Sequence, residues 1–443
     1  MTLPEAAVQW HELLPPPERS AMLRLRQGVP AIRRQSLEGS RRSYENAQLQ
    51  PADAGPDCST PSRLILELPM RMRAAVLREP MKPRPYRESK PFAIEEVELE
   101  PPGEGEVLVR IRAAGLCHSD LSTVNGDRPR PMPMVLGHEA AGEVVEPGPG
   151  VKDLAAGDHV ILVFVPSCGS CLPCMEGRPG LCEPAVPANA SGTLLSGARR
   201  IKLGGQPVNH HIGVSAFAEY AVVSRHSLVR IERDLPFEEA ALFGCAVVTG
   251  AGAVLNTARL PTGSSVAVVG LGGVGLMSML AARAAGARQV IALDTLEEKL
   301  KLARQMGATH TINAASPDAV EQVKAASGGG VEFAFEMASS VKALELAYRI
   351  TRRGGTTVTA SLPHPDARFA LPAANLVAEE RTLKGSYIGS CVPARDIPRY
   401  IALYRQGMLP VDRLLSERIA LPDINEAFDR LADGATVRQV LIP

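Results

Sequence analysis

The chain of 443 residues has room for about two to three domains, and its 45% hydrophobic and 22% charged residues are typical of an ordinary soluble globular protein. Lysine plus arginine equals aspartate plus glutamate at 48 each, so the charge predicts neither a nucleic-acid partner nor an acidic membrane surface. Aromatic residues make up 4%, which argues against stacking platforms for single-stranded nucleic acid.

Targeting and membrane signals are absent from the sequence pattern. No basic region followed by an apolar run opens the chain, so no signal peptide is expected. The apolar stretch 240–255 is shorter than the ~20 residues that span a bilayer. The stretch 264–282 carries glycines in a turn pattern and is interpreted as strand, turn and helix. We therefore expect a cytoplasmic protein with no membrane partner.

Residues 1–70 differ from the rest of the chain. They are rich in proline and arginine, contain no lysine and have no clean hydrophobic period. A short helix at 21–26 is the only candidate element, and too little apolar material is present to offset the entropy of ordering. This segment is predicted to be a poorly ordered N-terminal extension.

Residues 71–246 are predicted to form an all-β module. Short apolar or alternating runs are separated by proline and glycine turns, a pattern typical of an irregular barrel. The predicted strands cover residues 74–77, 92–98, 106–113, 141–145, 159–165 and 218–223.

Residues 247–388 then alternate between strands and helices, which predicts a doubly wound parallel sheet. The predicted strands cover 266–270, 289–294, 310–314, 331–336, 356–361 and 384–389, with helices that include 276–285, 296–306 and 341–351. The final segment, 389–443, carries helical patterns at 397–406 and 424–432. We expect this segment to pack back on the β module.

A dinucleotide site is predicted where strand 266–270 runs into the turn GLGGVG. Its glycines allow a tight turn and close approach to a diphosphate at the helix N-terminus. The cofactor-binding candidates in this turn are Gly270, Gly272, Gly273, Val274 and Gly275. Asp294 ends the next strand, where a carboxylate binds the ribose hydroxyls and favours NAD over NADP, and Lys299 is within reach of the same ribose. An ordinary turn with Asp294 as a helix cap is the alternative.

Four cysteines lie within one short loop, at positions 168, 171, 174 and 182. Nearby glycine and proline residues let the loop wrap around one ion. Four thiolates without a histidine form a closed tetrahedral zinc site that leaves no position for substrate. A structural zinc held by Cys168, Cys171, Cys174 and Cys182 is predicted, with an iron–sulfur cluster or free buried cysteines as alternatives.

Cys117, His138 and Cys245 are candidates for a second metal site. Two thiolates and one imidazole would leave zinc a fourth position for a water or substrate oxygen. The three residues come from distant segments, so spacing alone does not join them. A buried cysteine, a core histidine and, for the adjacent Glu139, a charged turn residue remain the plain alternatives.

Several motifs closely resemble the zinc-containing medium-chain dehydrogenase/reductase family, in particular its long-chain alcohol dehydrogenase branch. The resemblance covers about residues 72–443, in the family's order. It includes GLCHSD, GHEAAGEV, the four-cysteine loop, SAFAEYAVV, FGCAVVTGAGAV, GLGGVG and FEMAS. The resemblance implies a GroES-like β-barrel catalytic domain beside a Rossmann domain, with two zinc ions and NAD per subunit.

By this resemblance the chain is an alcohol dehydrogenase that transfers hydride reversibly between a zinc-bound alkoxide and NAD, giving an aldehyde or ketone. Cys117, His138 and Cys245 would hold the catalytic zinc. Ser119 would take the substrate proton, Asp120 would orient the histidine, and Glu139 would lie behind the zinc. The remaining implied contacts are to the cofactor: His118 and Arg438 at the diphosphate, and Thr249 near the nicotinamide.

One position departs from the family pattern. Many members pass the substrate proton to a histidine at the place that Ser122 takes here, and a serine is not a near-neutral base. Phe164 is interpreted either as a substrate-pocket residue or as a core phenylalanine. Cys58 and Cys391 match no ligand position. A homodimer or a homotetramer is expected.

Two other functions remain open. A thiol-dependent formaldehyde dehydrogenase or S-nitrosothiol reductase would bind a charged thiol conjugate. The stretch 184–190 lacks basic residues for it, although Arg128 and Arg130 keep this function open. A non-catalytic NAD-binding protein would have lost a zinc ligand or Ser119, and the sequence retains all of them.

Overall fold

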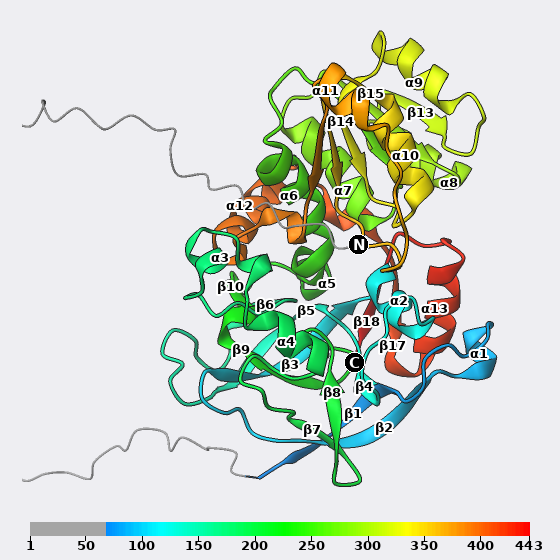
Figure 1. The fold of residues 1–443 in the computed structure, drawn as a ribbon. Coiled ribbons are helices and arrows are strands. Elements are labelled where there is room, and N and C mark those ends of the chain that lie inside the picture. Colours follow the sequence, from blue (N-terminus) through cyan, green and yellow to red (C-terminus); the bar gives the residue numbers. More distant parts are fainter. Residues whose placement is uncertain (1–67) are drawn as a thin grey trace, which may run out of the picture. The chain divides into compact units, whose positions relative to one another are not determined.

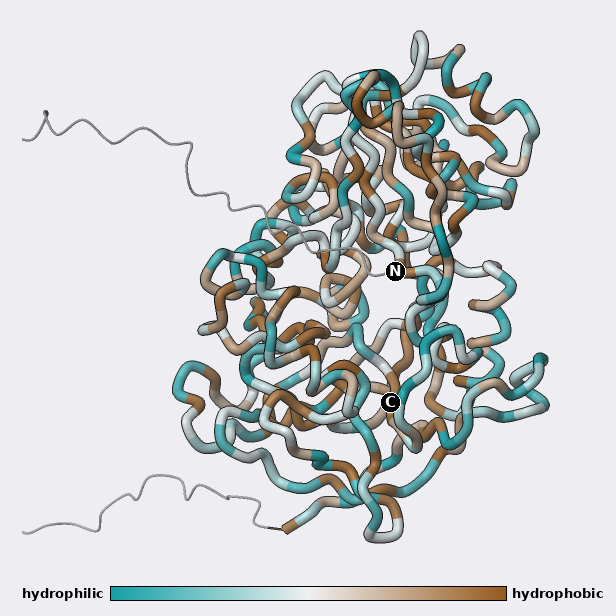
Figure 2. The backbone as a smooth tube through the Cα atoms, in the orientation of Figure 1, coloured by the Kyte–Doolittle hydropathy of each residue, from teal (hydrophilic) through white to brown (hydrophobic). Residues whose placement is uncertain are grey.

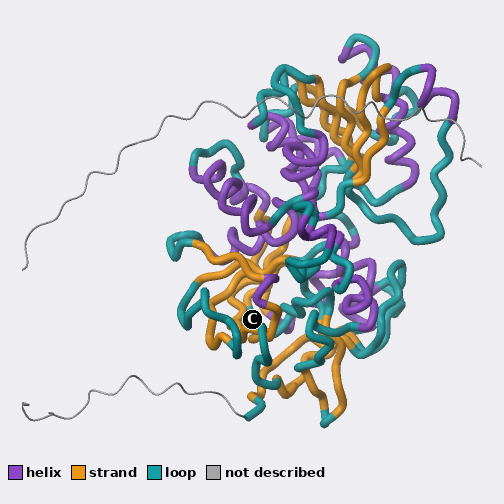
Figure 3. Tube along the Cα trace, turned by 60° about the vertical axis from the view of Figure 1, so that its left-hand side comes forward, coloured by secondary structure: helices purple, strands orange, loops and turns teal. Residues whose placement is uncertain are grey.

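The computed structural model describes residues 68–443, which belong to one compact unit of the chain. The helix predicted at 21–26 and Cys58 lie outside the described residues. Strands gather in separate groups with helices packed around them (Figures 1 and 3). Hydrophobic stretches follow the strands and the central helices (Figure 2). The architecture combines a β-barrel module with a parallel α/β sheet, as predicted.

A small closed barrel opens the described chain. β1 starts at Met70, the last residue of the segment predicted to be an extension, and pairs with β2 from Met70 opposite Leu99 to Leu77 opposite Phe92. The second half of β1, Ala74–Leu77, is buried on both faces, whereas β2 buries only Phe92, Val97 and Leu99. The barrel strands in spatial order are β1 (Met70–Leu77), β2 (Phe92–Leu99), β7 (Ile201–Leu203), β8 (Gln206–His210) and β4 (Met134–Val135).

A seven-stranded sheet completes this half of the fold. The C-terminal strand β18 lies antiparallel to β3, with Leu441 opposite Ala114 and Val440 opposite Gly115. The end of the chain therefore reaches the residues that precede Cys117. The sheet runs in the order β10 (Leu228–Ile231), β6 (His159–Val163), β5 (Glu139–Pro147), β3 (Glu106–Gly115), β18 (Arg438–Ile442) and β17 (Leu415–Ala420), with β9 (Tyr220–Ser224) paired to β3.

The second half is a six-stranded sheet in which all neighbours are parallel. Its spatial order is β13 (His310–Asn313), β12 (Gln289–Asp294), β11 (Ser265–Val269), β14 (Val331–Glu336), β15 (Thr351–Thr359) and β16 (Thr382–Gly385). This is the order of a doubly wound nucleotide-binding sheet. Strands β11 to β13 follow one another toward one edge of the sheet and β14 to β16 toward the other, so the strand order changes direction between β11 and β14. The strand predicted at 384–389 is wrong in its second part, because Ile388 and Gly389 adopt positive φ angles of 48° and 64° that no extended strand contains.

The helices of the described residues cover the sheets and connect their strands. They are α1 (Tyr86–Ser89), α2 (His118–Val124), α3 (Leu172–Met175), α4 (Ala185–Ser191), α5 (Phe237–Leu242), α6 (Val248–Gly252), α7 (Gly273–Ala284), α8 (Glu297–Gln305), α9 (Ala319–Ser327), α10 (Val341–Ile350), α11 (Ala373–Ala378), α12 (Pro393–Arg405) and α13 (Ile424–Ala432). The predicted helices at 276–285, 296–306, 341–351, 397–406 and 424–432 all correspond to observed ones, with shifted ends for the first four.

One continuous helical stretch, Phe237–Ala258, links the two halves. It comprises α5, a π-helical segment (Phe243–Val247), α6 and a second π-helical segment (Ala253–Ala258). At 22 residues it is long and apolar enough to cross a membrane, so the length argument made for 240–255 was wrong. In the structure 83% of the most apolar 18 residues of this stretch are buried, as expected for a helix in a protein core.

Two glycines of this stretch let its backbone lie directly against the backbone of each half. A Cβ on Gly244 would lie 2.4 Å from the Leu162 carbonyl oxygen in β6, and one on Gly250 would lie 2.4 Å from the Val274 carbonyl oxygen in α7. Cβ atoms do not approach carbonyl oxygens this closely. Because Gly244 and Gly250 have no side chain, the helix can pack this closely against both halves, and these two contacts determine how far apart the halves lie.

We predict that Gly244→Ala lowers stability. Alanine gains up to about 1 kcal/mol in helix propensity, but overpacking against a carbonyl that cannot rotate away costs about 1–3 kcal/mol. The thermal unfolding midpoint should fall by several degrees, measured by scanning calorimetry. Gly385→Ala is the matched control, because no atom lies within 4 Å of its added Cβ. Equal midpoints for the two variants would contradict this packing account.

Candidate active site and metal centres

The turn between β3 and α2 carries the first candidate ligand. Cys117 is the residue that precedes the helix, and its side chain is buried. Its backbone N–H donates to Asp120 Oδ2 at 3.2 Å, so the two residues cap the helix reciprocally. The sequence segment GLCHSD thereby forms a fixed corner that presents the Cys117 thiol at the helix N-terminus.

His138 precedes β5, directly after Gly137, whose φ of 91° suits glycine. Its Nδ1 lies 2.9 Å from Asp120 Oδ1, and both side chains are buried. Asp120 also accepts a hydrogen bond from the Gly137 N–H at 3.3 Å. Within residues 68–443, Nε2 of His138 is buried without a partner. The ring is therefore oriented by one nitrogen and leaves the other free to bind.

Cys245 comes from the π-helical segment and completes the group. One ligand atom each from Cys117, His138, Glu139 and Cys245 lies within 4.8 Å of all the others, and all four residues are buried. The fold thus brings together three residues whose spacing in the sequence could not join them. Two thiols and a free imidazole nitrogen are donors that suit zinc and leave one coordination position open.

Electrostatics in this group favour a cation. A hydrogen bond with the Cys245 thiol holds the pKa of Cys117 well below its ordinary value, and Arg438 and His138 add to this shift. Burial alone would raise that pKa. Burial alone would lower the pKa of His138, but Asp120 and Cys117 hold it well above its ordinary value. A thiolate on Cys117 and a protonated His138 therefore stabilise each other, and a divalent metal bound here would displace the proton on Nε2.

Glu139 and Arg438 lie together beside this group. Burial raises the pKa of Glu139 to about 7, and Arg438 opposes that shift with its Nε 3.5 Å from Oε1. Both carboxylate oxygens lack a hydrogen-bond donor among the described residues. Arg438 also donates to the Leu116 carbonyl at 3.2 Å, and its side chain occupies the space beside Gly273. It therefore connects the metal group to the glycine turn.

Sequence reasoning missed His211. Its side chain is buried, and Nδ1 lies 3.3 Å from Asp120 Oδ1. The His211 and His138 rings are 5.6 Å apart and nearly perpendicular. No spacing rule connects positions 120 and 211, so only the folded chain reveals that Asp120 faces two imidazoles.

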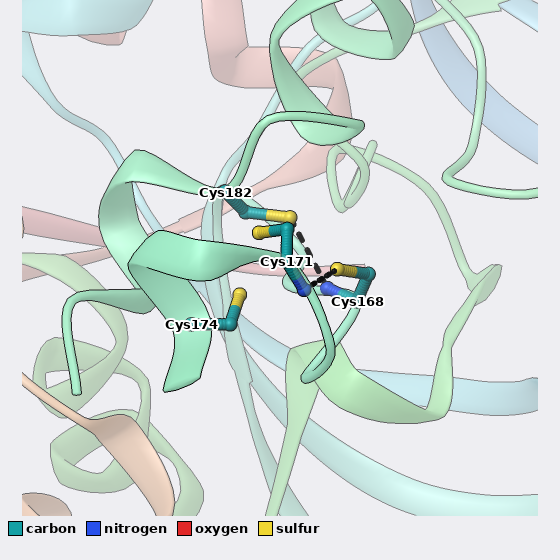
Figure 4. Close-up of side chains that lie close together, drawn as sticks. All are labelled: Cys168, Cys171, Cys174 and Cys182. Carbon is teal, nitrogen blue, oxygen red and sulfur yellow. Dashed lines mark hydrogen bonds between the residues drawn. The ribbon is translucent and has the colours of Figure 1, made fainter. Parts of the chain in front are cut away.

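The four-cysteine loop forms a separate cluster, in which the ligand atoms of Cys168, Cys171, Cys174 and Cys182 lie within 4.8 Å of one another. Figure 4 shows the four thiols converging from the loop around α3. Backbone N–H groups of residues 170 and 171 donate to Cys168 Sγ and lower its pKa to about 6, whereas burial raises that of Cys174 to about 12. The all-sulfur set suits a closed zinc site.

A cavity of about 1020 Å³ runs from the group of Cys117, His138 and Cys245 to the glycine turn at the end of the parallel sheet. Gly270 has a φ of 93°, and a Cβ there would lie 2.7 Å from Ala338 Cβ, so glycine is required at the turn. A Cβ on Gly272 would meet nothing within 4 Å, which leaves space for a ligand. The candidate cofactor residues that line the cavity are His118, Thr249, Gly270, Gly272, Gly273, Val274, Asp294, Lys299 and Arg438. Gly275 instead packs against the Gly270 carbonyl.

Asp294 has two tasks in the structure. Its Oδ2 accepts from the Leu271 N–H at 2.7 Å, and its Oδ1 accepts from the Leu296 N–H at 3.0 Å. These bonds tie the ends of β11 and β12 together at the glycine turn. Each carboxylate oxygen keeps a second lone pair for a ligand in the cavity. The alternative of Asp294 as a helix cap is wrong, because Leu296 is the residue that precedes α8 and no side chain caps that helix.

Ser119, Ser122 and Phe164 all line the cavity. Ser122 Oγ donates to the His118 carbonyl at 3.0 Å, so its proton is engaged within α2. The Phe164 ring lies edge-on to the His138 ring at 5.2 Å.

Cys391 is buried away from the cavity, and its thiol donates to the Val248 carbonyl. It joins neither thiol cluster of the described residues.

Comparisons with known proteins agree with this geometry. Residues 103–233 match the model for the alcohol dehydrogenase GroES-like domain, and residues 273–406 match that for a zinc-binding dehydrogenase. An S-(hydroxymethyl)glutathione dehydrogenase from Synechocystis is 38% identical over 376 residues, which cover 84% of this chain and 100% of the relative. An NDMA-dependent alcohol dehydrogenase from Amycolatopsis methanolica is 35% identical, over 84% of this chain and 99% of its own.

Solved structures give the same result. The crystal structure of benzyl alcohol dehydrogenase from Acinetobacter calcoaceticus is 33% identical with a TM-score of 0.78, over 84% of this chain and 99% of that one. An alcohol dehydrogenase zinc-binding domain protein from Burkholderia ambifaria is 35% identical with a TM-score of 0.79, over 85% and 100%. The chain therefore belongs to the zinc-containing medium-chain dehydrogenase/reductase family.

Proposed function

We propose that this protein is a zinc-dependent alcohol dehydrogenase that interconverts an alcohol and its aldehyde or ketone with NAD. One observation carries the proposal: the unpartnered Nε2 of His138 lies beside two buried thiols at a cavity that also contains the glycine turn. A metal and a dinucleotide would thus meet in one enclosed space.

In this proposal Cys117, His138 and Cys245 hold the catalytic zinc. When bound there, zinc supplies a Lewis acid that makes the alcohol proton easier to remove, and the nicotinamide accepts the hydride. The loop cysteines Cys168, Cys171, Cys174 and Cys182 hold a second, structural zinc.

The surrounding residues prepare this chemistry. Asp120 keeps the Nδ1–H of His138 engaged, so that Nε2 presents its lone pair. Ser119, which lines the cavity, accepts a hydrogen bond from the substrate hydroxyl and, as it receives that proton, gives its own hydroxyl proton to water. Glu139 and Arg438 balance charge behind the metal ligands.

The cofactor is proposed to be NAD rather than NADP. Asp294 binds the ribose hydroxyls and repels a 2′-phosphate, with Lys299 at the same end of the cavity. His118 and Arg438 contact the diphosphate, and Thr249, whose Oγ1 is buried without a partner, contacts the nicotinamide. The homodimer or homotetramer and the cytoplasmic location stay predictions.

Thiol-dependent formaldehyde oxidation is a second candidate function. The relatives named S-(hydroxymethyl)glutathione dehydrogenase favour it, including one from Paracoccus denitrificans that is 34% identical. Arg128 and Arg130 line the same cavity and offer positive charge to such a conjugate.

Metal content tests the two zinc sites. Wild-type protein should contain two zinc ions per subunit, measured by inductively coupled plasma mass spectrometry. Cys117→Ser should contain one, because the open site loses a thiolate, and should lose alcohol oxidation. Cys391→Ser is the matched control and should keep two. A single zinc in the wild type would contradict the two-site account.

Asp294→Asn tests cofactor choice. The amide oxygen keeps one acceptor for the glycine turn, while the negative charge is lost. The ratio of kcat/KM for NADP to that for NAD should rise about tenfold or more, as expected when about 1.4 kcal/mol of repulsion is removed. Initial rates from NADH or NADPH absorbance give this ratio, and an unchanged ratio would overturn the role of Asp294.

Ser122→His tests the proton path. A histidine there adds a base with an ordinary pKa of about 6.5, so alcohol oxidation should become less dependent on pH between about pH 6 and 8. Ser122→Ala should keep the wild-type profile. Identical pH–rate profiles for wild type and Ser122→His would count against a missing relay at this position.

A further inference from the structure

One turn of the cavity wall has an unfavourable backbone conformation. Ile388, Gly389 and Ser390 have positive φ angles of 48°, 64° and 49°. Glycine tolerates this region, but isoleucine and serine are strained there and keep the conformation only where the surrounding structure holds them. Tyr387 and Ile388 both line the cavity. The shape of the cavity at this place therefore depends on whatever restrains the turn.

The long helical stretch Phe237–Ala258 lies directly behind this turn. A Cβ on its Gly252 would overlap the Gly389 carbonyl oxygen, and a Cβ on Gly389 would overlap the Val248 carbonyl oxygen. The side-chain amide of Asn256, one helical turn after Gly252, donates to the Gly389 carbonyl at 3.4 Å. The helix thus fixes the middle of the turn through close backbone contacts.

Thr257, the next residue of the helix, joins the two ends of the turn. Its Oγ1 lies 2.8 Å from Ser386 Oγ and 2.9 Å from Ser390 Oγ. A hydroxyl group can donate one hydrogen bond and accept another, so Thr257 can bond to both serines at once. One side chain therefore sets the separation between the residues that flank 387–389.

Tyr387 lies between these two anchors and continues an aromatic wall that starts at the metal group. The Phe164 ring is 5.2 Å from the His138 ring, and the Tyr387 ring is 6.3 Å from the Phe164 ring. An alcohol whose oxygen is held beside His138 would lay its apolar body along this wall. A two-carbon alcohol would end at Phe164, whereas an aromatic alcohol would extend to Tyr387.

We propose that Thr257 is a positioning residue for substrate specificity: by joining Ser386 to Ser390, it holds Tyr387 against the body of a large apolar alcohol. Thr257 does not itself line the cavity, so it acts through the turn. The inference rests on the proposed alcohol dehydrogenase function. It assigns the recognition of large alcohols to the same helix that carries the candidate metal ligand Cys245.

A contact that only stabilises the fold is the alternative role for Thr257. Its loss would lower the unfolding temperature and would reduce activity with small and large alcohols alike. A positioning role predicts a loss that is specific to large alcohols and that requires the Tyr387 side chain.

The first test is Thr257→Val, which removes the hydroxyl group and keeps the branched shape. In zinc-loaded protein with NAD, kcat/KM for benzyl alcohol should fall about tenfold, as for the loss of one methylene-sized contact in an apolar pocket. The loss should appear mainly in KM, while kcat/KM for ethanol stays near wild type. Thr257→Ser restores a hydroxyl group and should recover most of the lost kcat/KM.

A double-mutant cycle tests whether the effect passes through Tyr387. Tyr387→Ala alone should lower kcat/KM for benzyl alcohol, and addition of Thr257→Val should then change it little, because coupled residues are not additive. Thr262→Val is the matched control. It removes a threonine hydroxyl that donates to the Ala285 carbonyl at 3.1 Å away from the cavity, so it should behave as wild type.

Equal losses for ethanol and benzyl alcohol in Thr257→Val would overturn the inference, and so would the same loss with and without Tyr387. If Thr257→Val does not fold, Ser390→Ala gives the same comparison, because it removes one of the two hydrogen bonds at an exposed residue. Turnover of either alcohol by wild type leaves the proposed function intact in each case. No turnover of any alcohol by zinc-loaded wild type would overturn the proposed function, and the inference with it.

Discussion

The carboxylate of Asp120 is fully buried, where it accepts N–H bonds from Cys117 and Gly137 and lies 2.9 Å from His138 Nδ1. Burying a carboxylate costs several kcal/mol unless its oxygens are satisfied. Here that requirement ties the end of β3, the start of α2 and the start of β5 into one corner. The same bonds orient His138, so Nε2 is free and faces the buried thiols. The proposed metal chemistry depends on this corner.

The second half of the site depends on close backbone contacts. Gly244 and Gly250 set how the long helix lies between β6 and α7, and this helix carries Cys245. Arg438, from the last strand, reaches Glu139 and the Leu116 carbonyl while lying against Gly273. The metal group and the glycine turn therefore share a fixed separation.

Features with a local signal could be predicted from the sequence. Strand 289–294 contains the apolar run 290–293, strand 331–336 is apolar except for Glu332 and Glu336, and the four-cysteine loop is defined by spacing alone. The strands β4 and β7 contain two and three residues, too few to show alternation, so no periodicity could reveal them. His211 was missed because its partner Asp120 is distant in the chain. Cys117, His138 and Cys245 could be grouped only through a family resemblance, since the fold alone brings them together.

Locating the metals in a crystal is the most direct test of the account. Anomalous diffraction recorded above and below the zinc absorption edge should give two peaks per subunit. The account predicts one peak within bonding distance of Cys117 Sγ, His138 Nε2 and Cys245 Sγ, with a fourth position taken by a non-protein ligand. The other peak should lie among the four loop cysteines. A peak at the loop with none at the His138 group, in protein that oxidises alcohols with NAD, would contradict it.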